Sequence, residues 1–134
     1  MTVMNNYTLR LFHQSDAEEL FALLTREGEE WKDYWWGAEA QAKYLNALVS
    51  EPSYVIFDGN TLAGYMRCMT THGYGVVVWD LLIDKAHRGK EYGLHLMEQV
   101  KADYPDQPIY IMSDADPYYE KLGYKVEGTI FTIP

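Results

Sequence analysis

The 134-residue chain has one cysteine, Cys68, so it cannot build a disulfide framework or a thiolate metal cage by itself. No apolar run approaches the ~20 residues that a membrane-spanning helix needs. The stretch MTVMNNYTLRLF at the N-terminus lacks a basic region followed by a long apolar core, so we expect no signal peptide. These absences together predict a cytoplasmic protein with no membrane partner.

Positive charge is also scarce: 11 Lys and Arg oppose 20 Asp and Glu, for a net charge of −9. A protein that binds the nucleic-acid backbone needs a basic surface, so the balance argues against nucleic acid as a partner. Acidic residues concentrate between Asp16 and Glu39, where eight carboxylates accompany only Arg26 and Lys32. A cationic partner or substrate explains this cluster, and a solvated helix face with a loop explains it more simply.

The length suits one domain, and no repeat, linker or low-complexity tract divides the chain, so we predict a single domain over 1–134. Hydrophobic periodicity separates helices from strands, and Asp58-Gly59 favours a hairpin turn. The predicted strands are 7–12, 53–57, 61–69, the apolar run 73–84, 108–112 and 125–133. The predicted helices are 17–24, with a stop at Gly28, then 38–49, 93–104 and 116–123.

The segment 76–112 is strand–helix–strand, an arrangement that makes its two strands parallel. Because a hairpin precedes it, we predict a mixed, mostly antiparallel sheet with helices on both faces. The predicted fold class is α/β, or α+β under a stricter definition. Residues Ser15 to Glu18 have a capping-box pattern, which predicts that the Ser15 hydroxyl begins the first helix.

Three cations, Lys85, Arg88 and Lys90, fall within six positions where the buried strand ends and the 93–104 helix begins. The first amides of a helix have no intrahelical acceptor and carry partial positive charge, so this junction suits a phosphate or pyrophosphate. An ordinary strand–helix turn with surface cations is the alternative. Neither the P-loop pattern nor the dinucleotide fingerprint is present. The junction consists of Arg88, Gly89, Lys90, Glu91, Tyr92 and Gly93.

This junction resembles the phosphate-binding motif of the GNAT superfamily of acyl-CoA N-acyltransferases, Gln/Arg-x-x-Gly-x-Gly/Ala after a buried strand. Arg88, Glu91 and Gly93 occupy its positions, and YYEKLGY at 118–124 resembles a later motif of the family. The resemblance covers nearly the whole chain in the family's order of elements. Glu91 departs from the pattern, because a carboxylate near the pyrophosphate weakens binding unless it turns to solvent or pairs with a lysine.

The resemblance implies acetyl-CoA as co-substrate, no metal, and direct transfer of an acetyl group to an amine of a small-molecule or peptide acceptor. It implies that residues 88–93 bind the pyrophosphate while Leu81, Leu82 and Ile83 run beside the pantetheine. In the family a distortion of this central strand frees an amide toward the thioester oxygen. The amide of Leu82 or Ile83 is the expected oxyanion donor.

Two residues are candidates for catalytic proton transfer. Tyr119 matches the family tyrosine that protonates the departing CoA thiolate, although most of the 12 tyrosines have structural roles. Helical spacing places Tyr118 and Leu122 on the core face and turns Tyr119 about 100° away. Asp80 interrupts an apolar strand and shares a face with Leu82. It is either a general base or a hydrogen-bonded structural carboxylate.

The segment EGEEWKDYWWG at 27–37 falls where the family shapes its acceptor site. The resemblance therefore makes Glu30, Trp31, Tyr34 and Trp35 the expected substrate-binding residues, as an acidic and aromatic pocket for an ammonium group. The alternative is a loop whose aromatic side chains simply pack onto the sheet.

Two other function classes remain open. A non-catalytic acyl-CoA sensor or regulatory module of the same fold is favoured by Glu91, and a partner-binding fold without cofactor is a third alternative. The given sequence stops at TIFTIP, so by the resemblance we expect the family's usual last strand to be short or absent. An open sheet edge is able to recruit a second copy, so a homodimer is a further expectation.

Overall fold

The computed structural model describes residues 6–134. Its sheet has five strands in the order β1-β2-β3-β4-β5. The strands are β1 (Tyr7–Leu11), β2 (Ser53–Asp58), β3 (Thr61–Thr70), β4 (Val76–Ile83) and β5 (Ile109–Ile111). The α-helices are α1 (Ala17–Glu27), α2 (Lys32–Trp35), α3 (Ala38–Ser50), α4 (Tyr92–Asp103) and α5 (Asp116–Lys121). Short 3-10 helices lie at η1 (Gln14–Asp16), η2 (Glu29–Trp31) and η3 (Lys85–His87).

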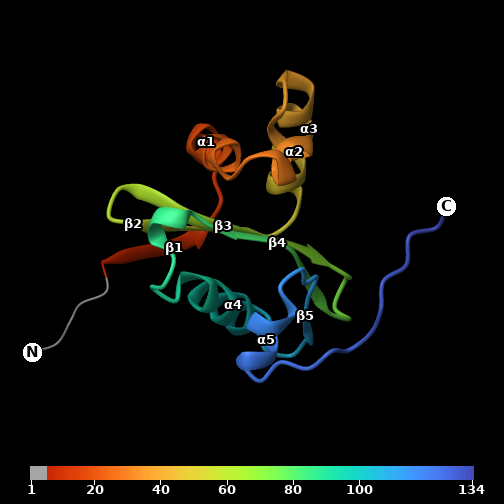
Figure 1. The fold of residues 1–134 in the computed structure, drawn as a ribbon. Coiled ribbons are helices and arrows are strands. Elements are labelled where there is room, and N and C mark those ends of the chain that lie inside the picture. Colours follow the sequence, from red (N-terminus) through yellow and green to blue (C-terminus); the bar gives the residue numbers. More distant parts are fainter. Residues whose placement is uncertain (1–5) are drawn as a thin grey trace, which may run out of the picture.

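Helices cover both faces of the sheet (Figure 1). Helices α1, α2 and α3 lie on one face, and α4 and α5 lie on the other. Each of the strands β1, β2 and β3 pairs antiparallel with the next strand. Strands β4 and β5, which α4 connects in the sequence, pair parallel. The predicted mixed, mostly antiparallel fold with a parallel strand–helix–strand unit is therefore confirmed.

Each face of the sheet has its own hydrophobic core. Leu20, Leu24 and Val55 belong to the core under α1 and α3, whereas Ile56 and Leu96 belong to the core under α4. Neighbouring residues Val55 and Ile56 of β2 thus enter different cores, because side chains alternate along a strand. A strand covered on both faces needs apolar side chains on both, which explains the continuous apolar runs in the sequence.

The start of α1 differs from the predicted capping box. The Asp16 carboxylate accepts the backbone N–H of His13 at 2.8 Å, across the 3-10 helix η1 that precedes α1. The same carboxylate binds the Arg10 guanidinium through both oxygens, at 2.7 and 2.8 Å. The hydrogen bond from Arg10 lowers the pKa of Asp16. These bonds hold the 3-10 helix η1, and α1 follows it from Ala17 with no side-chain hydrogen bond at its own N-cap, so the predicted box of Ser15 and Glu18 does not form.

The predicted last strand, 125–133, is wrong. These residues form neither helix nor strand, and no backbone hydrogen bond joins them to another part of residues 6–134. Their composition favours a strand, but a strand forms only beside an edge with which it pairs. The sheet of the described residues accordingly ends at β5.

Gly64 of β3 marks the tightest approach between β3 and β4. A methyl group there would lie 2.7 Å from the Leu82 carbonyl oxygen, so Gly64→Ala should lower the free energy of unfolding by about 1–3 kcal/mol. Gly128→Ala is the matched control, because nothing lies within 4 Å of a methyl group there. Urea unfolding measures both variants, and a Gly64→Ala protein as stable as the control would contradict this packing.

Candidate functional site

Strand β4 contains one residue more than the part of β3 that it faces. Arg67 pairs with Asp80 and Cys68 pairs with Val78, so Trp79 has no partner of its own. An extra residue of this kind is a β-bulge, which changes the direction of the backbone groups that follow it. The distortion that the family resemblance implies for the central strand is therefore present, at Trp79.

The hydrogen bonds at the two ends of β4 show the effect of the bulge. The Val76 amide donates to the Pro108 carbonyl beside β5, at 3.0 Å. The Asp84 amide, an even number of residues later, donates instead to the Ala63 carbonyl of β3, at 2.8 Å. In a regular strand these two amides would face the same neighbour, because the direction alternates with every residue. The side of the strand to which every second amide points therefore changes within β4.

After this reversal, β4 has an edge that no strand covers. Alternation back from Asp84 directs the amide of Leu82 toward β3 and the amides of Leu81 and Ile83 away from it. Strand β5 pairs only with Val76–Val78, so it does not reach these residues. Leu81 thus presents a backbone donor and acceptor, and Ile83 a backbone donor, to a ligand that runs alongside β4; the Ile83 carbonyl already accepts a hydrogen bond from Arg88.

The junction between β4 and α4 carries a run of unpaired amides. The backbone N–H groups of residues 88–94 have no backbone or side-chain acceptor within residues 6–134. Gly89 and Glu91 have positive φ angles of 83° and 63°, which fold this backbone into a concave turn. Because α4 begins here, its partial positive charge adds to the unpaired donors. The arrangement suits an anion such as a phosphate or pyrophosphate.

The cationic side chains of the junction are already paired. The Arg88 guanidinium binds Glu27 of α1 at 2.9 Å and the Ile83 carbonyl at 3.0 Å. Lys90 donates to the Asp58 carboxylate at 2.8 Å, and this bond lowers the pKa of Asp58. These contacts attach the junction to α1 and to the β2–β3 hairpin. Because the pairs are solvent-exposed, they position the loop more than they stabilise the fold.

Glu91 occupies a backbone position that glycine suits better. As the residue that precedes α4, it has φ 63° and ψ 22°, in the left-handed region. This conformation costs a residue with a side chain roughly 1–2 kcal/mol, a penalty that glycine does not have. The Glu91 side chain is exposed and has no ion-pair partner in the described part of the chain. Its carboxylate therefore turns to solvent and does not pair with Lys90.

Gly93 lies where the first turn of α4 meets the uncovered edge of β4. A methyl group in its place would lie 3.6 Å from the Tyr118 hydroxyl and 3.9 Å from Cγ1 of Ile83. The sequence pattern placed Tyr118 on the core face, but its side chain is 44% exposed and its hydroxyl points to this junction. Sequence reasoning missed Tyr118, because the orientation of the short α5 helix depends on tertiary packing.

Tyr119 packs against the core under α4, with its ring stacked on Tyr124 at 6.2 Å. Burial, with a smaller contribution from Tyr118, raises the pKa of Tyr119 to about 12. The phenol therefore stays protonated at neutral pH and is able to donate a proton.

Asp80 lies on the opposite face of the sheet, toward α2 and α3. Its carboxylate is 7% exposed and accepts hydrogen bonds from Tyr34 at 3.0 Å, Tyr44 at 2.7 Å and Arg67 Nε at 2.7 Å. The Tyr44 hydroxyl also lies 2.8 Å from that of Tyr65. Buried charges persist when they are paired and hydrogen-bonded, and this carboxylate meets both conditions. The geometry fits the structural alternative for Asp80.

The aromatic segment 30–35, which precedes α3, packs onto the buried side chains that surround Asp80. Tyr34 stacks on Tyr44 with ring centroids 4.0 Å apart, and Trp31 meets Tyr65 edge-on at 6.4 Å. Trp35 donates its indole N–H to the Gly28 carbonyl at 3.2 Å, whereas Glu30 is exposed. Packing thus accounts for the half-buried aromatic side chains. The segment also brings a predicted substrate-binding residue, Tyr34, into contact with Asp80.

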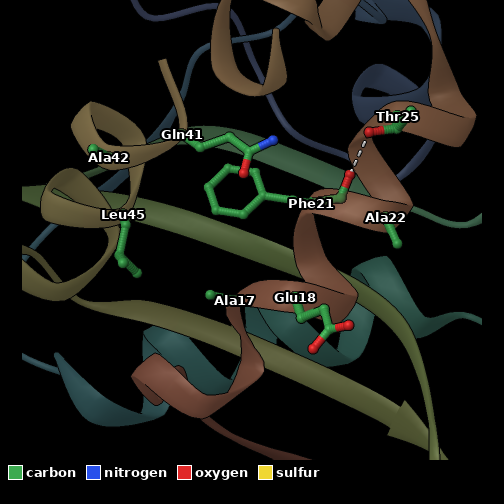
Figure 2. A pocket seen from close by; sticks show the side chains of 8 residues that line it. All are labelled: Ala17, Glu18, Phe21, Ala22, Thr25, Gln41, Ala42 and Leu45. Carbon is green, nitrogen blue, oxygen red and sulfur yellow. Dashed lines mark hydrogen bonds between the residues drawn. The ribbon is translucent and has the colours of Figure 1, made fainter. Parts of the chain in front are cut away.

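A separate pocket of about 500 Å³ lies between α1 and α3 (Figure 2). The Thr25 hydroxyl donates to the Phe21 carbonyl beside it, at 2.7 Å. The lining includes none of the predicted site residues and none of the unpaired amides, so we do not place the site there. It consists of Ala17, Glu18, Phe21, Ala22, Thr25, Gln41, Ala42 and Leu45.

Other kinds of site find little support in the described part of the chain. No group of three or more His, Cys, Asp and Glu side chains among residues 6–134 is placed to hold a metal ion. Cys68 is buried, and burial raises the pKa of its thiol to about 12, so the thiol is unreactive. Within the same residues, every helix is too short or too polar to span a lipid bilayer.

The comparison with protein families identifies the family. The family model described as "Acetyltransferase (GNAT) family" matches residues 13–124. The chain belongs to the GNAT acetyltransferase family. This family and its fold support an acyl-transfer function. Acetyl-CoA is the usual acyl donor of GNAT proteins, and the unpaired amides of residues 88–94 fit the pyrophosphate of such a donor.

Solved structures share this GNAT fold. An aminoglycoside acetyltransferase from an uncultured soil metagenomic sample has 20% identity and a TM-score of 0.73, over 96% of this chain and 97% of that chain. A transcriptional regulator from Bacillus halodurans C-125 has 17% identity and a TM-score of 0.72, over 96% and 99%. A ribosomal-protein-alanine N-acetyltransferase from Brucella melitensis biovar Abortus 2308 has 18% identity and a TM-score of 0.69, over 96% and 98%.

Removal of one partner of the buried ion pair should destabilise this GNAT protein strongly. Asp80→Ala leaves the Arg67 charge without a partner, so we expect the free energy of unfolding to fall by about 3–5 kcal/mol. The double variant Asp80→Leu/Arg67→Met should recover much of that loss, because both charges are gone. Denaturant unfolding of the two variants measures the difference. A single variant as stable as wild type would show that the pair contributes nothing.

Proposed function

We propose that this GNAT protein transfers an acetyl group from acetyl-CoA to an amine of a small-molecule or peptide acceptor. The run of unpaired amides at residues 88–94, next to the uncovered edge of β4, carries the proposal. A pyrophosphate would satisfy the amides. The amide-containing pantetheine would pair with the backbone of Leu81 and Ile83 as an added strand does.

The chain's own groups then have distinct tasks. Acetyl-CoA supplies a thioester whose carbonyl carbon the neutral acceptor amine would attack, with loss of the CoA thiolate; the proton that the nitrogen loses would pass to water and so restore the phenol that protonates the thiolate. Of the two predicted oxyanion donors, the Ile83 amide points toward the uncovered edge and the Leu82 amide points toward β3, so we favour Ile83. The Leu81 amide is a further candidate, because it points to the same edge as the Ile83 amide. Tyr119 remains the proposed proton donor to the departing thiolate on the strength of its motif. Tyr118 is the second candidate, because its hydroxyl lies beside Gly93.

We place the acceptor over the α2 face of β4, with Glu30, Trp31, Tyr34 and Trp35. Tyr34 is fixed by its hydrogen bond to Asp80 and by its stacking, so it would present a defined aromatic surface to the acceptor amine. Asp80 would act through Tyr34, as a positioning residue, because three donors already occupy its carboxylate. The acceptor class remains a small-molecule or peptide amine.

A non-catalytic acyl-CoA sensor is the second candidate function. Glu91 favours it, because its carboxylate accompanies the amides proposed to bind an anion. One structural relative is described as a transcriptional regulator, which suits a regulatory role. A sensor and an enzyme share the binding step and differ only in whether thiol is released.

Isothermal titration of the purified protein with acetyl-CoA, with ATP and NAD as controls, tests the shared step. We expect selective binding of acetyl-CoA, and its absence would overturn both functions. A panel of polyamine, amino-acid, aminoglycoside and peptide amines then tests turnover. Release of free CoA thiol with one of these amines supports the enzyme, whereas binding without release supports the sensor.

Glu91→Gly should bind acetyl-CoA more tightly than wild type. Removal of a carboxylate at about 6 Å from a phosphate in water is worth roughly threefold in affinity. Glycine should also raise the free energy of unfolding by about 1 kcal/mol, because it relieves the left-handed backbone. Glu91→Gln separates the two effects, since it removes the charge and keeps the strain. Titration and urea unfolding measure them, and unchanged affinity in both variants would place the pyrophosphate elsewhere.

Tyr119→Phe should lower kcat by about 10²-fold and leave acetyl-CoA affinity nearly unchanged, because only the donated proton is lost. Tyr118→Phe is the matched control and should retain most of the activity. Steady-state kinetics with the preferred amine measures both variants. The opposite result, with activity lost in Tyr118→Phe alone, would transfer the acid role to Tyr118.

A further inference from the structure

Arg67 of β3 uses only part of its guanidinium to pair with the buried Asp80 carboxylate. Its Nε atom donates to Asp80 Oδ2 at 2.7 Å, and its Cζ atom lies 5.4 Å from the centre of the Tyr44 ring. The two Nη atoms have no hydrogen-bond acceptor within residues 6–134. Among the fully buried side-chain N and O atoms of those residues, only His87 Nδ1 lacks a partner, so the Arg67 Nη atoms reach solvent.

A second arginine of the same chain shows a different way to pair with a carboxylate. Arg10 binds both oxygens of Asp16 through both of its Nη atoms, at 2.7 and 2.8 Å. This two-pronged arrangement is the strong form of an arginine–carboxylate pair. Arg67 instead meets Asp80 from the side, through Nε, and leaves both Nη atoms unoccupied. A guanidinium that is fixed at Nε and free at both Nη atoms is ready to bind a second carboxylate.

The free side of Arg67 lies next to the surface proposed for the acceptor amine. Tyr34 donates to Asp80 Oδ1 at 3.0 Å and Arg67 donates to Asp80 Oδ2, so one carboxylate joins the two side chains. An anion on Arg67 and an amine beside Tyr34 would therefore be only a few bonds apart in one molecule. An α-amino acid has this arrangement. A polyamine has no anion, and the N-terminal amine of a long peptide is far from its terminal carboxylate.

We propose that Arg67 binds the carboxylate of the acceptor, and that the acceptor is an α-amino acid. This inference rests on the proposed acetyl transfer and narrows its acceptor class. The amine nitrogen would bond to the acetyl carbon as the C–S bond breaks. CoA would leave as its thiol, and the proton lost by the nitrogen would pass to water. The product is an N-acetylamino acid that keeps the carboxylate by which Arg67 recognises it.

The charges on this face of the sheet suit a molecule that carries both signs. The Arg67–Asp80 pair has no net charge, and the tyrosine hydroxyls that bond to Asp80 disperse its negative charge, so an acceptor carboxylate meets little repulsion. The Arg67 side chain is 12% exposed, and a charge-assisted hydrogen bond is stronger where little water competes. The exposed carboxylates of Glu30 and Asp33 on the neighbouring segment would attract the ammonium end.

Each common α-amino acid, assayed beside its carboxamide, tests the inference on the wild-type protein. Release of CoA thiol from acetyl-CoA measures turnover. We expect kcat/KM to be at least about tenfold higher for the preferred amino acid than for its carboxamide, because the carboxamide gives Arg67 no charged acceptor. The adjacent carboxylate also keeps the amine of an amino acid more protonated. Without recognition by Arg67, the carboxamide would therefore be the better substrate.

Arg67→Lys keeps a positive charge beside Asp80 but loses the planar guanidinium. The ratio of kcat/KM for the amino acid to that for the carboxamide should fall at least about tenfold, mainly through a higher KM for the amino acid. Lys32→Gln is the matched control, because Lys32 is a cation of the nearby helix α2 that already lies 3.5 Å from Glu29. This variant should keep the wild-type ratio.

The outcomes separate this inference from the function on which it rests. Turnover of carboxamides or other amines at least as fast as that of the amino acids would overturn the carboxylate recognition and leave acetyl transfer standing. A preference that Lys32→Gln abolishes and Arg67→Lys keeps would also overturn it. Absence of thiol release with every amine would overturn the proposed enzyme together with this inference. The wild-type comparison needs no variant, so it decides the matter even if Arg67→Lys fails to fold.

Discussion

One edge of β4 pairs with β5 along its first part and is uncovered along its second part. The extra residue at Trp79 makes this change possible. Before Trp79 the outward backbone groups bond to β5, and after it they face an edge that no strand covers. The bulge also places Asp80 toward the helices of the opposite face, where Arg67 and two tyrosines fix its carboxylate. One inserted residue therefore creates the proposed pantetheine edge and anchors the aromatic segment proposed to receive the acceptor.

The β4–α4 junction of this acidic chain carries Arg88 and Lys90, yet both side chains are already paired with carboxylates. Arg88 bonds to Glu27 and Lys90 bonds to Asp58, so both side chains fix the loop to other elements. The groups that remain available are backbone amides at the start of α4. Recognition of an anion would thus rest on a preorganised main chain, which explains how a protein with net charge −9 can offer such a site.

Local patterns in the sequence predicted α1, α3, α4 and α5, the hairpin and the parallel crossover, because each depends on periodicity or turn chemistry within a short window, whereas the four-residue helix α2 was not predicted. Features that depend on tertiary partners were not predictable in this way. The predicted box of Ser15 and Glu18 does not form, and Asp16 instead binds Arg10 of β1 and the His13 amide. Residues 125–133, expected to form a strand, do not pair with any strand of the described sheet. The reversal at Trp79 leaves no trace in composition, so the choice between the Leu82 and Ile83 amides needed the register.

The left-handed turn at Gly89 and Glu91 has a consequence for how this protein can change over evolutionary time. Main-chain donors do not depend on which side chains accompany them, so the junction can accept many substitutions that keep its φ angles. The requirement is one of shape, and the present chain meets it even with a glutamate where glycine fits more easily. Solved structures that are only 14–20% identical to the chain share its fold, so the fold itself persists through extensive change in sequence.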